Sequence, residues 1–126
     1  MLSTGVDILF IPRVQSALDR FGDRFLARCY TPREIAACRG HISEFAARYA
    51  AKEAVSKALG VGLRLMSRQG VQFHEVEILP DHYGKPNVYL TGKALARAQE
   101  LGLTEWAVSL THEREYTVAF VVASTR

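Results

Sequence analysis

Cysteine is scarce in this chain of 126 residues. Its two cysteines, Cys29 and Cys38, form no C-x-x-C pair and have no partners for a disulfide framework or a metal cluster. This scarcity argues against a disulfide-rich secreted domain and against a cysteine-ligated zinc site. We expect two reduced thiols that fill space in a cytoplasmic protein.

Long apolar runs are also missing. No stretch of about eighteen apolar residues occurs, so we expect no membrane span. The N-terminal segment has no basic residue ahead of its apolar stretch and places Asp7 inside it, which argues against a signal peptide. Internal repeats, low-complexity tracts and linkers are absent. The length suits one hydrophobic core, so we expect a single domain over residues 1–126.

A strong charge of one sign is missing too. The chain has 16 basic and 13 acidic side chains, which give a net charge of +3. That excess is too small to indicate nucleic-acid binding, and basic residues are not interleaved with aromatic ones as that function requires. Where the basic residues lie is more informative than their sum.

The segment FAARYAAKEAVSKALG, residues 45–60, predicts a helix. Alanine has the highest helix propensity, and Gly60 suits the left-handed position that ends a helix. On a helical wheel, small residues cover one narrow face that can approach a neighbouring element closely. The opposite side is expected to be solvated, with one surface ion pair between Glu53 and Lys57. The small face comprises Ala47, Ala51, Ala54, Val55 and Ala58, and the polar side Arg48, Lys52, Glu53, Ser56 and Lys57.

The rest of the chain predicts an α+β domain of about three main helices packed on a mostly antiparallel sheet of about five strands. Strands follow from alternating apolar residues, and helices from apolar stripes between capping signals. Helices are expected from Pro12 onward with a possible break at Gly22, at 31–39 after a capping box, and at 91–101 with Thr91 as cap. Strands are expected at 3–11, 71–79, 87–90, 106–110 and 116–123, with turns at 81–86 and 111–115 and a loop at 60–70.

Asp7 lies within the first expected strand, among apolar neighbours on its own face. A carboxylate in that position either reaches the strand edge, as a satisfied turn or edge aspartate, or is buried and needs a partner or a bound cation. The segment alone leaves both interpretations open.

Three arginines, Arg13, Arg20 and Arg24, fall close together on the wheel of the first expected helix. Like charges at this spacing repel one another unless an anion meets them. The stripe is either a solvated basic face or a docking surface for an acidic partner. A break at Gly22 would split it.

Several short motifs occur in a fixed order along the chain. They are GVDI at residues 5–8 followed by Arg13, RYAAKEA at 48–54, SKALG at 56–60, GKP at 84–86 and VSLTH at 108–112. Together they resemble the holo-[acyl-carrier-protein] synthases, which are short, single-domain 4′-phosphopantetheinyl transferases. The resemblance runs from Gly5 to about Val122, and the alanine-rich block is its most specific part. Thr111 stands where a serine is common in the family.

The resemblance implies transfer of the phosphopantetheine arm of coenzyme A to a serine of apo acyl carrier protein, with adenosine 3′,5′-bisphosphate as by-product, in fatty acid biosynthesis. It implies Mg²⁺ as cofactor, with Asp7 and Glu53 as ligands, because this ion takes carboxylate and phosphate oxygens. Lys57 and His112 are implied to act on the pyrophosphate. The acceptor of the serine proton stays open between Glu53, directly or through a water, and His112, with Glu53 favoured.

The resemblance also implies where the partners bind. The arginine stripe of Arg13, Arg20 and Arg24 would steer the acidic carrier protein, and the family forms homotrimers with sites at subunit interfaces. A non-catalytic module that binds an acidic protein through the same stripe is the alternative, but it gives no reason for Asp7 and Glu53 to occur together. The residues implied to bind coenzyme A are Arg48, Lys57, Gly60, Lys85, Pro86, Thr111 and His112.

Overall fold

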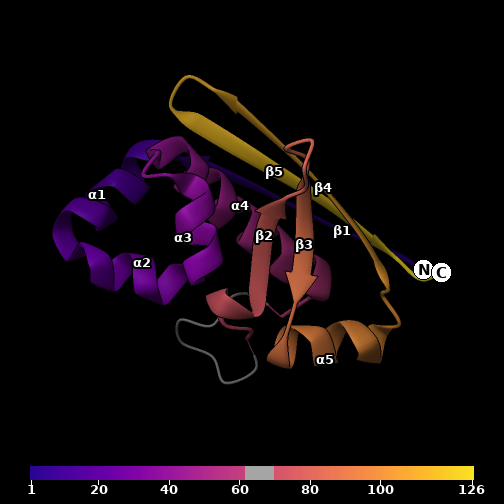
Figure 1. Ribbon diagram of the computed structural model, residues 1–126. Coiled ribbons are helices and arrows are strands. Elements are labelled where there is room, and N and C mark those ends of the chain that lie inside the picture. Colours follow the sequence, from indigo (N-terminus) through magenta and orange to yellow (C-terminus); the bar gives the residue numbers. More distant parts are fainter. Residues whose placement is uncertain (62–69) are drawn as a thin grey trace.

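A three-stranded antiparallel sheet crossed by one long helix forms the centre of the fold (Figure 1). The strands are β1 (Leu2–Phe10), β5 (Tyr116–Ser124) and β4 (Glu105–Glu113), in the order β1-β5-β4. The helix is α4 (Ile42–Leu59), which packs mainly on β1 and β5. The computed structural model describes residues 1–61 and 70–126, so most of the loop predicted at 60–70 lies outside the described residues.

A separate two-stranded sheet stands next to β4. It is a hairpin of β2 (Val76–Pro80) and β3 (Pro86–Leu90), and α5 (Gly92–Leu101) follows it. The strand predicted at 71–79 begins later than expected because residues 73–75 form a short 3₁₀ helix, η1 (Phe73–Glu75). Although β3 neighbours β4, no ladder joins the two sheets in the part of the chain that the structure describes.

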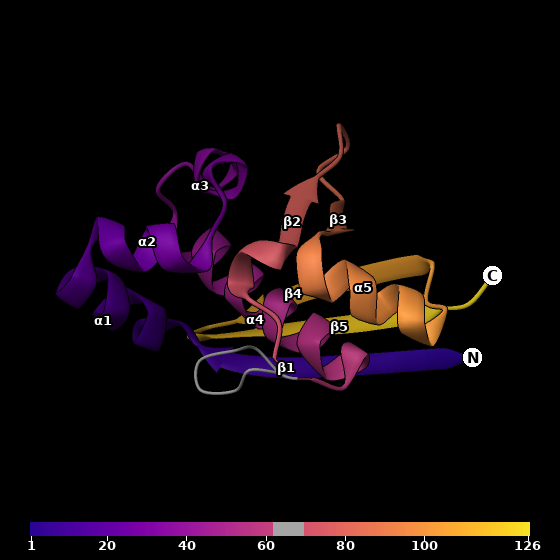
Figure 2. The ribbon, with the colours of Figure 1, turned by 90° about the horizontal axis from the view of Figure 1, so that it is seen from below.

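Three shorter helices, α1 (Ile11–Phe21), α2 (Asp23–Cys29) and α3 (Pro32–Cys38), gather at one end of the central sheet, and α5 lies toward the other (Figure 2). Gly22, with a φ of 56°, separates α1 from α2, so the possible break occurs. The capping box predicted before α3 is present, with Thr31 and Glu34 bonded reciprocally.

The predicted α+β class, with helices packed on mostly antiparallel strands, is confirmed. The strands divide between two sheets, and the first expected helix becomes two. Thr91 precedes α5 as expected, but its side chain does not cap the helix. The Glu75 carboxylate, from η1, instead accepts hydrogen bonds from the backbone N–H groups of Lys93 and Ala94. Sequence patterns favour local caps, and this one comes from a distant element.

Helix α4 is buried on almost every side, so the prediction of a solvated polar side was wrong. Arg48, Lys52 and Ser56 are all buried. The reason is that α3 and β2 cover this side of the helix and provide polar partners for it. Arg48 Nε donates to Ile78 O at 3.0 Å, for example, which satisfies a group that would otherwise have to face water.

Both cysteines are buried, and neither forms a disulfide. Burial raises the pKa of each thiol, Cys29 and Cys38, to about 11. The thiols therefore stay protonated and unreactive at neutral pH, which agrees with a structural role. Among the described residues, no helix is long and apolar enough to cross a membrane.

The two chain ends lie side by side (Figure 1). Thr125 N donates to Met1 O at 3.1 Å, and the Met1 amino group donates to Thr125 Oγ1 at 2.9 Å. They meet at the end of the sheet opposite the paired residues Phe10 and Tyr116.

Candidate functional site

Two carboxylates and a lysine meet where α4 crosses β1. Asp7 Oδ1, on β1, lies 3.1 Å from Lys57 Nζ, which also donates to Val6 O at 3.0 Å. Glu53, one turn before Lys57 on α4, is partly buried and close enough to Asp7 for the two carboxylates to interact electrostatically. The structure thus brings Asp7, Glu53 and Lys57 together. The ion pair of Lys57 is made with Asp7, however, and the predicted surface pair with Glu53 was wrong.

Gly5 decides how closely α4 approaches β1. A Cβ atom at this position would lie 1.8 Å from Ala54 O and 3.0 Å from Ala58 N, so no other residue fits without moving the helix. Ala54 and Ala58 belong to the small-residue face predicted to pack closely. This contact carries Glu53 and Lys57 to within reach of Asp7.

The environment of Glu53 favours its protonated form. Partial burial raises the pKa of this carboxyl, the Asp7 carboxylate raises it further, and Lys57 opposes both effects. Two neighbouring carboxylates that share one lysine form a site of surplus negative charge. Such a site suits a bound cation or a group that accepts a proton.

A stability measurement can detect this surplus charge. Because the pKa of Glu53 is higher in the folded chain than in the unfolded one, the free energy of unfolding falls as the pH rises from the unfolded pKa through the folded one. We expect Glu53→Gln to remove that penalty. Measured by urea unfolding with a chelator present, the variant should be more stable than wild type at pH 7 and lose this advantage below about pH 4, where both states are protonated.

Glu105→Gln is the control for that experiment, because Glu105 is an exposed carboxylate on β4 far along the chain from the cluster. It should show no stabilisation that grows with pH. A Glu53→Gln protein that was less stable than wild type at pH 7 would contradict a pKa of Glu53 that burial and the Asp7 carboxylate raise in the folded chain.

Tyr49 lies between the carboxylate cluster and a groove lined mainly by residues of α1 and α2. Burial raises the pKa of its hydroxyl to about 12, and Glu53, Arg13 and Asp7 are among the charged groups near enough to act on it. The groove consists of two hollows of about 170 and 530 Å³ that share Ala17, Phe25 and Tyr49. Its floor is therefore apolar and begins beside the cluster.

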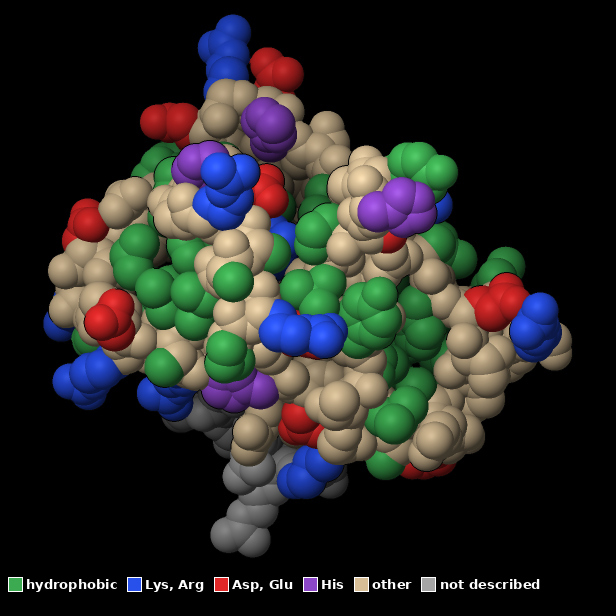
Figure 3. Space-filling view, viewed as in Figure 1, with side chains coloured by type: hydrophobic (Ala, Val, Ile, Leu, Met, Phe, Trp, Pro, Cys, Tyr) green, Lys and Arg blue, Asp and Glu red, His purple; other side chains and the backbone are tan. Residues whose placement is uncertain are grey.

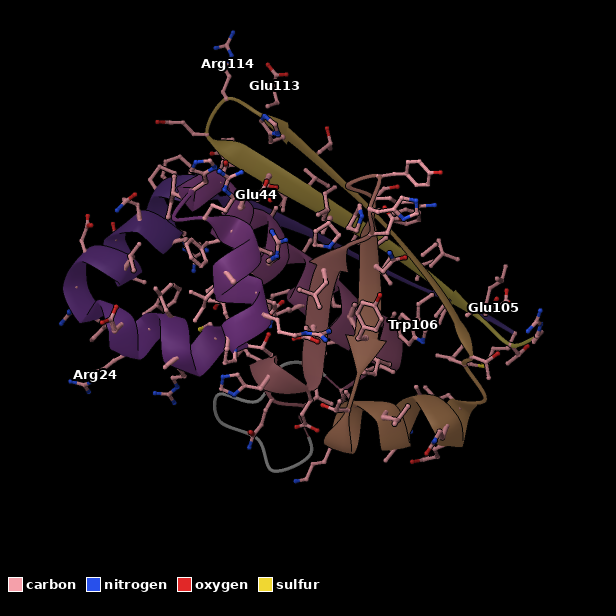
Figure 4. All side chains as sticks on the ribbon, viewed as in Figure 1. Arg24, Glu44, Glu105, Trp106, Glu113 and Arg114 are labelled. Atoms are coloured by element: carbon pink, nitrogen blue, oxygen red, sulfur yellow. The ribbon has the colours of Figure 1, made fainter. Side chains whose placement is uncertain are left out.

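The arginine stripe follows the rim of this groove. Arg13 lines the smaller hollow, Arg24 lines the larger one, and Arg20 is exposed on α1 with its guanidinium 5.3 Å from the Phe21 ring centroid. Figure 3 shows basic side chains along the margin of the molecule beside α2, and Figure 4 shows Arg24 pointing outward there. The break at Gly22 divides the stripe between two helices, yet all three arginines remain exposed.

A second concavity, a cleft of about 410 Å³, opens between the β2–β3 hairpin, α4 and β4. Arg48, Lys85 and Pro86 line it, together with Ser109 on β4. Glu44 lies at its rim, where its carboxylate is 3.0 Å from Arg48 Nη1 (Figure 4). Three of the residues implied to bind coenzyme A, from two segments distant in sequence, therefore share one cleft.

Thr111 and His112 continue β4 beyond the cleft-lining residues 108–110. His112 was expected in a turn, and the structure corrects this. The strand extends to Glu113, and the chain reverses through Arg114 and Glu115 only (Figure 4). His112 is exposed on a strand, with its backbone opposite that of Thr117.

The remaining expected residues lie elsewhere. Gly60 ends α4 with a φ of 74°, close to Arg97 of α5, and does not line the cleft. Lys57 does not line the cleft either, and its amino group contacts Asp7. Since β1 and β4 occupy opposite edges of the central sheet, the carboxylate cluster and the cleft are separated within one chain by roughly 10 Å of sheet.

Sequence reasoning assigned no role to Gly5, Glu44, Tyr49 or Ser109. Gly5, Tyr49 and Ser109 belong to the motifs that carry the resemblance, which gave a signal for them. Glu44 gave only a weak signal, four residues before Arg48.

Comparison with known proteins identifies the family of the chain. Residues 3–121 match the 4′-phosphopantetheinyl transferase superfamily. The chain is 46% identical to the holo-[acyl-carrier-protein] synthase of Herpetosiphon aurantiacus, over 97% of this chain and 98% of the relative. It is 50% identical to that of Solidesulfovibrio magneticus, over 94% of each chain.

Solved structures agree with the sequence relatives. The holo-[acyl-carrier-protein] synthase of Helicobacter pylori in complex with coenzyme A is similar with a TM-score of 0.84 and 30% identity, over 96% of this chain and 99% of the other. The synthase of Neisseria meningitidis gives the same TM-score with 31% identity, over 98% of both chains. The chain therefore belongs to the 4′-phosphopantetheinyl transferase superfamily.

Proposed function

We propose that this protein transfers the 4′-phosphopantetheine arm of coenzyme A to a serine of apo acyl carrier protein, giving the holo carrier and adenosine 3′,5′-bisphosphate, in fatty acid biosynthesis. The observation that carries the proposal is the paired carboxylates Asp7 and Glu53 with Lys57, in a chain of this superfamily. The cleft holding Arg48 and Lys85 supports it with a place for an anionic nucleotide.

The mass of the carrier tests the proposal. The protein is incubated with coenzyme A, Mg²⁺ and an apo carrier, and the carrier is weighed by mass spectrometry. We expect it to gain the mass of one phosphopantetheine arm. No gain on any carrier would favour the alternative, a non-catalytic module that binds acidic proteins.

Asp7 and Glu53 fit a Mg²⁺ ion. Both are hard oxygen donors. Within residues 1–61 and 70–126 no group of three or more His, Cys, Asp or Glu side chains is arranged to hold a metal ion, so these two carboxylates would be the ligands from the protein. Mg²⁺ commonly uses one or two carboxylates and completes its shell with water and substrate phosphates. Bound here, the ion would neutralise negative charge on the pyrophosphate.

The residues of the chain supply the rest of the chemistry. Glu53 accepts the proton of the carrier serine, and its raised pKa brings it closer to the value suited to a general base. Lys57 moves from Asp7 to the phosphate that leaves, where its charge stabilises the developing negative charge. His112 binds the pyrophosphate from the end of β4.

The nucleotide end of coenzyme A occupies the cleft. Arg48 and Lys85 offer positive charge to its phosphates, and Pro86 offers an apolar surface to the base. Thr111 extends the same wall along β4, so the pyrophosphate can follow the strand toward His112.

The carrier docks on the groove between α1 and α2. Its acidic surface meets Arg13, Arg20 and Arg24, and the apolar floor around Phe25 and Tyr49 receives apolar side chains. This arrangement directs the carrier serine toward Asp7 and Glu53, which adjoin Tyr49.

Charge reversal at Arg24 is the test of this docking surface. We expect Arg24→Glu to raise the KM for the carrier about tenfold with little change in kcat. The reason is that an exposed charge acts mainly on the rate at which the two proteins associate. The difference from wild type should shrink as salt is added. Arg126→Glu, an exposed arginine at the far end of the chain, is the control and should leave KM unchanged. A rise in KM that ignored salt would contradict the electrostatic explanation.

The outer face of the central sheet supports a homotrimer. Figure 1 shows the sheet nearly edge-on, with the helices on one side of it only. On the other side Val6 is 54% exposed, Ile8 64% and Phe120 45%, and Val6 and Phe120 are directly paired. A continuous apolar face of this kind marks an interaction surface. We propose that association through this face brings the cleft of one copy near the carboxylates of the next.

Light scattering tests the assembly. We expect a particle of three times the 14.0 kDa of one chain. Ile8→Glu places a charge in the apolar face and should release single chains, whereas Thr104→Glu, at an exposed position before β4, should not. A wild-type protein that remains a single chain at micromolar concentration would refute the trimer.

The proposed reaction takes place in the cytoplasm, where coenzyme A and carrier protein are expected to meet. The buried, unpaired Cys29 and Cys38 suit a reducing compartment.

A further inference from the structure

A fully buried ion pair lies on the side of α4 away from the carboxylate cluster. Lys52 Nζ is 2.6 Å from Glu34 Oε1, and both side chains have no exposed surface. Burial lowers the pKa of Lys52, and Glu34 opposes this effect. Removing two charges from water is unfavourable, and well-packed apolar residues often serve stability as well. Stability alone therefore does not explain the pair.

The pair joins four elements of the fold. On α3, Glu34 Oε1 also accepts from Thr31 N at 2.9 Å, and Glu34 Oε2 accepts from Ile78 N of β2 at 2.9 Å. From α4, Lys52 Nζ donates to Phe73 O of η1 at 2.9 Å. Each oxygen of the buried carboxylate accepts at least one hydrogen bond. The lysine adds α4 and η1 to the elements α3 and β2 that Glu34 joins.

These bonds hold the free edge of the β2–β3 hairpin. Ile78 N donates to the Glu34 carboxylate, and Ile78 O accepts from Arg48 Nε. Side chains of α3 and α4 therefore occupy the edge of β2 that faces away from β3. A two-stranded hairpin is marginally stable alone. The position of this hairpin, and of Lys85 and Pro86 in the cleft, therefore depends on these charged side chains.

The same bonds fix the rotation of α4. Lys52 immediately precedes Glu53, and successive residues of a helix project about 100° apart. With Lys52 anchored toward η1 and α3, Glu53 turns toward β1 and Asp7. One buried pair thus lies between the two halves of the site.

We propose that Glu34 and Lys52 are positioning residues that align Glu53 with Asp7 and hold the β2–β3 hairpin in place for coenzyme A. This inference rests on the function proposed above. Neither residue touches a reacting group, and both act through the elements that they join.

The double variant Glu34→Leu with Lys52→Met tests the proposal, because it removes both charges and keeps apolar volume in their place. We expect its thermal midpoint to stay close to that of wild type. Its kcat/KM for coenzyme A should fall at least about tenfold, with a higher KM and a lower kcat. Calorimetry without carrier should show weaker coenzyme A binding. The matched control, Glu105→Leu with Arg126→Met, removes an exposed pair and should change neither.

A folded double variant with wild-type kcat and KM would overturn the proposal. If that variant does not fold, Glu34→Gln decides by the same measurements, since it keeps the shape of the side chain but loses its negative charge and one of the two oxygens that accept from Lys52, Thr31 and Ile78. Should Glu34→Gln also unfold, the pair serves stability and the proposal fails. Wild-type protein is assayed in parallel, and if it transfers no arm, the proposed function itself has failed.

Discussion

Glu53→Gln should lower the rate of arm transfer by about 10³-fold or more while the fold stays intact. The amide has the shape of the carboxylate but no negative charge, so it neither accepts the serine proton nor holds a cation with Asp7. General-base catalysis alone commonly contributes about 10²–10⁴-fold, and a weakened cation site would add to the loss. The rate is followed as the mass of the apo carrier increases, with Mg²⁺ and coenzyme A saturating.

Two controls make this result specific. Glu105→Gln makes the same chemical change at an exposed position on β4 and should transfer at the wild-type rate. Circular dichroism and urea unfolding should show that Glu53→Gln is folded and, at pH 7, more stable than wild type. Loss of activity in a more stable protein cannot come from unfolding. Transfer at the wild-type rate by Glu53→Gln would remove Glu53 from both the proton-transfer and the metal-binding roles.

Gly5→Ala should cause the largest loss of stability of any single methyl group added to the sheet. The added Cβ would lie 1.8 Å from Ala54 O, a backbone atom in the middle of α4 that cannot rotate away. Overpacked cores typically lose about 1–3 kcal/mol, and relief here requires the whole helix to move. We therefore expect the free energy of unfolding to fall by about 3 kcal/mol or more in urea titrations.

Thr4→Ala is the matched control, because Thr4 adjoins Gly5 but is exposed on the outer face of β1. It should lose about 1 kcal/mol or less. Any Gly5→Ala protein that still folds should also lose transfer activity, since α4 would carry Glu53 away from Asp7. If Gly5→Ala were as stable as Thr4→Ala, the close approach would not be a constraint on the fold.

Local patterns in the sequence predicted the fold class well. The alanine-rich helix, the capping box at Thr31 and the alternating strands are all determined by neighbouring residues. The environment of the helix was not predictable in this way. Lys52 and Arg48 look like solvent-facing residues on a wheel, and their partners Glu34 and Ile78 lie 18 and 30 residues away.

The candidate site was predicted mainly by resemblance. The residues alone left Asp7 open between an edge aspartate and a cation ligand, and nothing local indicated that it meets Lys57. The separation of the cleft from the carboxylates follows from the strand order β1-β5-β4, which no short motif encodes. His112 was misplaced because β4 and β5 reverse through two residues, so the strand continues past the expected turn.

The adjacent chain ends bear on how carrier binding is best measured. Met1 and Thr125 meet at one end of β1, whereas the arginine-rimmed groove begins beyond the other end of that strand. A biotin tag on either terminus would therefore fix the protein to a sensor surface with its groove facing the solution, and the two attachments should report the same affinity for the carrier.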